Sequence, residues 1–70
     1  MMTLLYKVNR PFKAMAAVSG RERHFQPGET FLFDTGQTGA TVTIEVDKTL
    51  FLVDNSVFET CCTFKGDFTP

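Results

Sequence analysis

Several residue types are scarce in this chain. It has no tryptophan, a single histidine, His24, and only two cysteines, Cys61 and Cys62, which are adjacent. Adjacent cysteines do not make a disulfide framework, because a bond between neighbours would strain the peptide that joins them. One histidine with dispersed partners does not assemble a nucleophile–base constellation. The sequence therefore predicts a protein that is not an enzyme and that holds no cofactor and no metal.

Long apolar runs are also missing. No segment approaches the roughly 20 apolar residues that a membrane-spanning helix needs. The apolar start at residues 1–6 is too short for a secretory signal and has no basic segment before it. We therefore expect no membrane partner and a cytoplasmic location, with which two unpaired cysteines agree.

Aromatic side chains are abundant for so short a chain. The 70 residues include eight phenylalanines and one tyrosine, and 43% of the chain is hydrophobic. This length allows one domain with a modest core. Such a core cannot enclose every ring, so we expect aromatic surface to remain for a partner or for self-association.

The charges are divided unevenly along the chain. Residues 1–28 contain five cations and one carboxylate, a net charge of +4, whereas residues 29–70 contain two cations and seven carboxylates, a net charge of −5. Such a division can mark an interaction surface. It can also arise when basic and acidic strands pair within one sheet, where opposite charges stabilise each other.

Short alternating segments separated by turn residues predict an all-β fold. Residues 41–47 alternate without a fault, and the consecutive apolar residues 50–53 predict a strand covered on both faces. Gln26–Glu29 predicts a type II turn, because Pro27 suits its first central position and Gly28 its second. The other expected strands cover residues 4–8, 21–25, 30–34 and 60–64.

Residues 12–18 fit either a strand or a helix. Their lysine, alanine and methionine residues favour a helix, which Pro11 could open and Gly20 could close. As a strand, the segment would place Phe12, Ala14, Ala16 and Val18 on one face. We favour the strand, because an isolated two-turn helix is only marginally stable.

Together these segments predict five to six short strands in one strongly bent antiparallel sheet that closes into a small barrel over residues 1–64. Residues 65–70 are expected to be a frayed tail. The order of the segments resembles the SH3-like barrel, notably in the short helical turn expected at Asp54–Phe58 before a closing strand. The tryptophan that grips the ligand in peptide-binding SH3 domains is missing, so the resemblance concerns the fold and not proline-peptide recognition.

A basic stretch interleaved with aromatic residues is the strongest candidate site. Its cations are Lys7, Arg10, Lys13, Arg21 and Arg23. Cations can follow a phosphate backbone while aromatic rings stack on bases, which makes nucleic acid a possible partner. The sequence pI of about 5.6 and the acidic second half argue against this partner, and Phe12 and Phe25 suit a core equally well.

Three functional hypotheses follow. The first is a small protein-interaction module whose partner is an unknown protein or a second copy of the chain, forming a homodimer. The second is nucleic-acid binding through the basic residues 7–23. The third is a thiol or metal sensor that uses Cys61 and Cys62, for which His24 would have to lie beside them. The glycine-bearing loop at residues 36–39 lacks the lysine and the following helix of a phosphate-binding loop, so we interpret it as a hairpin loop.

Overall fold

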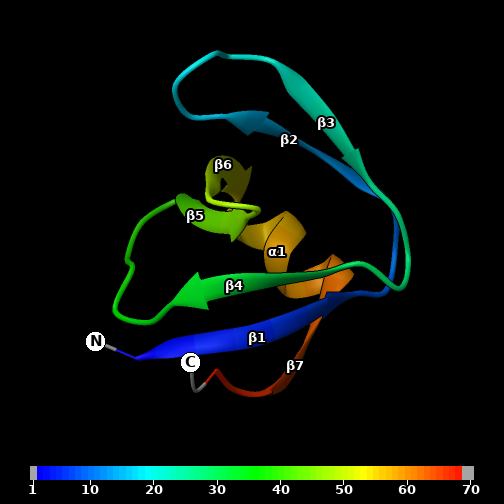
Figure 1. Ribbon diagram of the computed structural model, residues 1–70, viewed down its shortest axis with the longest axis vertical. Coiled ribbons are helices and arrows are strands. Elements are labelled where there is room, and N and C mark those ends of the chain that lie inside the picture. The colour runs from blue at the N-terminus through cyan, green and yellow to red at the C-terminus, as the bar shows by residue number, and fades with distance from the viewer. Residues whose placement is uncertain (1, 69–70) are drawn as a thin grey trace.

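A computed structural model, which describes residues 2–68, folds the chain into one antiparallel sheet with a single short helix in the described part (Figure 1). The strands follow one another across the sheet in the order β3-β2-β6-β5-β4-β1-β7. The elements are β1 (Thr3–Val8), β2 (Phe12–Ala16), β3 (Glu22–Phe25), β4 (Thr30–Asp34), β5 (Thr41–Val46), β6 (Thr49–Asp54), α1 (Asn55–Cys61) and β7 (Cys62–Asp67).

The all-β prediction is confirmed, but the predicted closed barrel of five to six strands is wrong. The sheet has seven strands and stays open, with β3 and β7 as its edges. The seven include the β2–β3 hairpin, whose two short arms pair with each other and through β2 with β6. Closure would require β3 to pair with β7. The first has only four residues and the second is bulged beside Leu5 and Tyr6, so neither offers a long regular edge.

Residues 12–18 resolve as a strand over Phe12–Ala16. Phe12, Ala14 and Ala16 are buried, whereas Lys13 and Met15 between them are exposed. Burial of every second residue is the pattern of a strand with one covered face. A helix would bury residues three or four positions apart instead. In Figure 1 the β2–β3 hairpin lies at the top, β4, β1 and β7 lie at the bottom, and β5 and β6 lie between them.

The core fills the concave side of the bent sheet, which we call the inner face; the opposite side is the outer face. The helix α1 covers part of the inner face, where the Phe58 ring lies 4.6 Å from that of Phe33 and 4.8 Å from that of Tyr6. Near the hairpin, Phe12 and Phe25 stack with ring centroids 4.9 Å apart. The buried core residues are Val8, Phe12, Ala14, Ala16, Phe25, Phe31, Val42, Ile44, Phe51, Val53, Phe58 and Cys62.

Two turns between strands contain residues with positive φ. The predicted Gln26–Glu29 turn is confirmed, because the Glu29 amide donates to the Gln26 carbonyl at 3.2 Å and Gly28 has a φ of 98°. Between β5 and β6, Asp47 and Lys48 both have positive φ, at 49° and 64°. This pair forms the tight left-handed turn whose twist matches that of the flanking strands.

The end of the chain is more regular than the sequence indicated. The expected single helical turn at Asp54–Phe58 is a helix that runs to Cys61, so the last strand starts at Cys62 and continues to Asp67. The Phe68 amide donates to the Thr3 carbonyl at 2.9 Å, beside β1. Of the expected tail, residues 69–70 lie outside the described residues.

Candidate docking surface on the outer face

The five predicted binding cations are not brought together on one face. Arg23 lies opposite the buried Ala14 on β2 and therefore faces inward, whereas Lys13 lies opposite His24 and faces outward. Lys7 is half-buried on β1, and the other two cations, Arg10 and Arg21, are exposed at the two ends of the β2–β3 hairpin. Because side chains alternate across a strand, the Lys13 and Arg23 side chains cannot contact one ligand surface together.

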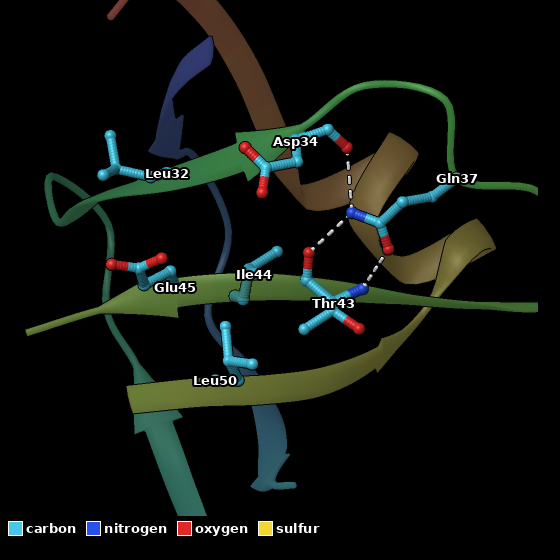
Figure 2. Close-up of a pocket in the computed structure, with 7 residues that line it drawn as sticks. All are labelled: Leu32, Asp34, Gln37, Thr43, Ile44, Glu45 and Leu50. Carbon is cyan, nitrogen blue, oxygen red and sulfur yellow. Dashed lines mark hydrogen bonds between the residues drawn. The ribbon is translucent and has the colours of Figure 1, made fainter. Parts of the chain in front are cut away.

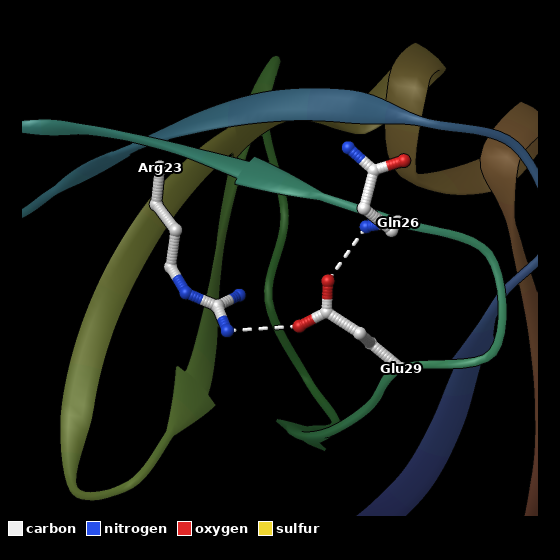
Figure 3. A network of polar contacts seen from close by, with 3 residues as sticks. All are labelled: Arg23, Gln26 and Glu29. Atoms are coloured by element: carbon white, nitrogen blue, oxygen red, sulfur yellow. Dashed lines mark hydrogen bonds and ion pairs between the residues drawn. The ribbon is translucent and has the colours of Figure 1, made fainter.

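Arg23 is a structural residue in this arrangement (Figure 3). Its Nη2 lies 2.8 Å from Glu29 Oε1, and its guanidinium carbon lies 4.3 Å from the centroid of the Phe25 ring. The Gln26 amide donates to Glu29 Oε2 at 2.7 Å. That backbone hydrogen bond, with the Arg23 guanidinium as a further cause, holds the pKa of Glu29 below its ordinary value of 4.5. Arg23 thus holds the hairpin against the turn that follows it.

The aromatic residues of the basic stretch are committed to the core. Phe12 and Phe25 are buried against each other, and the half-buried Tyr6 packs on Phe31 and Phe58. Bases stack on aromatic faces that solvent can reach, which the two stacked phenylalanines do not offer.

The two cysteines lie where α1 meets β7 and differ in burial. Cys62 is buried and Cys61 is half-buried, and both are free thiols. Burial, with the neighbouring Cys61 as a second cause, raises the pKa of the Cys62 thiol to about 12. In the described part of the chain, no three histidine, cysteine or acidic side chains gather where they could hold a metal ion.

An exposed apolar row crosses the outer face, and sequence reasoning missed it. Residues 50–53 were expected to be covered on both faces, but only Phe51 and Val53 are buried, and Leu50 and Leu52 remain 47% and 39% exposed. Met15 on the neighbouring β2 lies directly opposite Leu52 and is 47% exposed. We call Met15, Leu52 and Leu50 the outer row. Phe51 and Val53 point to the inner face, where they are buried in the core. The helix and the hairpin therefore cover β6 on its inner side only.

A cleft adjoins the outer row where β4 and β5 diverge (Figure 2). These strands share only two register pairs, Leu32 with Glu45 and Phe33 with Ile44. Beyond them the side chain of Gln37 bridges the strands: its Nε2 donates to the carbonyls of Asp34 and Thr43, each at 2.9 Å, and its Oε1 accepts from the Thr43 amide at 2.7 Å. A side-chain amide therefore replaces the backbone ladder at this point, because it carries the same donor and acceptor groups.

The cleft measures about 220 Å³ and has aliphatic walls with carboxylates between them. Leu32, Glu45 and Leu50 lie opposite one another on β4, β5 and β6, as Figure 2 shows. The Asp34 side chain also lines the hollow, and its Oδ1 accepts a hydrogen bond from the hydroxyl of Thr3 on β1 at 2.7 Å. We call this hollow the Gln37 cleft; it is lined by Leu32, Asp34, Gln37, Thr43, Ile44, Glu45 and Leu50.

The comparisons with known proteins add no family assignment. No protein-family model, no curated protein and no solved structure matches this chain. Within the described residues, no helix is long and apolar enough to cross a membrane. The candidate site therefore rests on the geometry of the outer face alone.

Proposed function

We propose that this chain is a non-catalytic protein-interaction module that docks a partner protein through the outer face of β2, β6, β5 and β4. The observation that carries the proposal is the outer row. Its residues belong to interior strands, which are hydrogen-bonded to neighbours on both sides. An apolar surface on such strands is already ordered, so a partner that binds it meets little conformational cost.

The outer row departs from the usual pattern of an antiparallel sheet. The solvated face of such a sheet normally carries polar side chains. On the outer face of β6, however, Leu50 and Leu52 are neighbours, and Met15 lies beside them on β2. Covering the exposed part of each side chain would contribute about 1 kcal/mol to binding. Charged neighbours on the same face, Glu45 and Lys13, supply the polar rim that protein interfaces commonly have.

The proposal is tested by selecting peptides on the folded chain. A random heptapeptide library displayed on phage is selected against the wild-type protein, and enriched peptides are synthesised. We expect the peptides to bind the double variant Leu50→Thr/Leu52→Thr at least about tenfold more weakly than the wild type, because both apolar contacts are lost. Threonine keeps the strand preference of these exposed positions.

A matched control separates the outer row from apolar exposure in general. Met2→Thr removes another exposed apolar side chain, which is 53% exposed and lies outside the row. This variant should leave peptide affinity unchanged.

Sedimentation velocity on the wild type tests whether a second copy of the chain occupies the outer row. A dimer that disappears in Leu50→Thr/Leu52→Thr identifies the partner as another copy. Peptides that bind both variants as well as the wild type would contradict docking at the outer row.

A further inference from the structure

We infer that the Gln37 cleft seats a lysine or arginine side chain of the partner protein. This inference rests on the proposed function, because it names the chemistry of the partner that docks beside the outer row. Leu50 belongs to both features, so a segment lying along the outer row meets the edge of the cleft at Leu50.

The polar groups of the cleft favour a donor-rich ligand. Both N–H groups of Gln37 are taken by the carbonyls of Asp34 and Thr43, and its oxygen is taken by the Thr43 amide. The carboxylates of Asp34 and Glu45 remain as acceptors, with one Asp34 oxygen shared with the Thr3 hydroxyl. Ammonium and guanidinium groups carry three and five donors and no acceptor, so they match such a site, whereas a carboxylate would be repelled.

The walls and the size of the cleft fit a side chain of this kind. Leu32 and Leu50 flank Glu45 on neighbouring strands, so a cation held by Glu45 would lay its methylene stem against two aliphatic side chains. Lysine and arginine bury their stems in this way while the charged end stays at the water boundary. The volume of about 220 Å³ is below the range of pockets for drug-sized ligands or cofactors but is adequate for one side chain.

The charge of the surrounding chain supports the same partner. Residues 30–54, which contain β4, β5 and β6, have four carboxylates and one lysine, a net charge of −3. On the outer face of β6, Asp54 continues the alternation of Leu50 and Leu52 and adds a third carboxylate. A negative field over this part of the face steers a basic segment toward it and disfavours an acidic one.

The experiment uses the selected peptides as probes of the folded chain. We expect them to contain a lysine or arginine next to an apolar residue, and we expect Glu45→Gln to raise their Kd by about tenfold. Replacing the peptide's basic residue with norleucine should cause the same loss on the wild type and little further loss on Glu45→Gln, which shows that the two groups interact. The control variant Glu59→Gln removes an exposed carboxylate of α1, outside the cleft, and should leave the Kd unchanged.

The outcomes separate the cleft from the docking face. Peptides that need Leu50 and Leu52 but bind Glu45→Gln and the norleucine form unchanged would overturn the cation site and leave the docking proposal intact. Failure to enrich any peptide on the wild type over Leu50→Thr/Leu52→Thr would overturn both. Equal losses in Glu45→Gln and Glu59→Gln would show only a general charge effect, which also overturns the cation site.

Discussion

Among the individual residues, Cys62 connects burial with a measurable pH dependence. The pKa of its thiol rises from an ordinary value of 9.0 to about 12 in the folded chain, chiefly through desolvation and secondarily through Cys61. The unfolded chain therefore loses this proton at a lower pH than the folded chain. Between pH 9 and pH 12 the unfolded state binds fewer protons, so the free energy of unfolding falls as pH rises.

We expect this decline to reach up to about 1.4 kcal/mol per pH unit from Cys62. It is measured by urea denaturation at pH 8 to pH 11, with the slope of the wild type compared with that of Cys62→Ala. The variant should be less stable at pH 8, because it loses buried volume, but its stability should fall less steeply with rising pH. Equal slopes would mean that Cys62 ionises in the folded chain as readily as in the unfolded chain.

Among the elements, the junction of β4 and β5 depends on one side chain. Gln37 forms three hydrogen bonds that continue the contact between the strands after their two register pairs. Gln37→Ala removes all three and leaves the partly buried backbone groups of Thr43 without these partners. We expect a loss of about 2 kcal/mol in the free energy of unfolding, measured by urea denaturation.

Thr38→Ala is the matched control for Gln37, because Thr38 is exposed in the same loop and its replacement should change stability by less than about 0.5 kcal/mol. Amide exchange gives a second readout. Faster exchange confined to Thr43 and its neighbours in Gln37→Ala would place the effect at the junction. A Gln37→Ala chain as stable as Thr38→Ala would show that water replaces the side chain at no cost.

A strand was predictable from the sequence where only one of its faces is covered, because apolar and polar residues then alternate. The alternation at residues 41–47 indicates a covered face and a free face, and Val42 and Ile44 are buried as it predicts. Residues 12–18 fitted a helix as well as the strand that the structure shows. The run Leu50–Val53 was misread, because four apolar residues in succession do not reveal whether a second layer covers the far side. The exposure of Leu50 and Leu52 in the folded chain shows that the outer side of β6 is open.

The candidate site was predictable to a smaller degree. The basic residues were visible in the sequence, but the inward position of Arg23 depends on its pairing with Ala14 and on its contact with Glu29. The Gln37 cleft gave no local signal, because a glutamine in a glycine-bearing loop looks like any polar loop residue. Its function as a bridge follows from the gap between β4 and β5, which the tertiary structure creates.

In the whole molecule, the order of the strands places acidic side chains between the basic ones. Lys7 on β1 and Lys13 on β2 are separated across the sheet by β4, β5 and β6. A phosphate backbone that joined the two lysines along the outer face would pass Asp34 and Glu45, which repel it. Binding of nucleic acid depends on cations that act together along one path, and each cation that cannot take part reduces the salt-dependent affinity.

We therefore expect no joint response to nucleic acid. Backbone-amide NMR spectra are recorded during titration with mixed-sequence single- and double-stranded DNA, at low and at physiological salt, with a basic peptide from the selection as the positive control. The peptide should shift the amide signals of β4, β5 and β6. The DNA should leave the amide signals of the basic residues unchanged. Concerted shifts of Lys7, Lys13 and Arg21 with DNA, weakening steeply as salt rises, would instead make nucleic-acid binding the leading function. That result would mean that the phosphates reach both lysines despite the carboxylates of Asp34 and Glu45 between them.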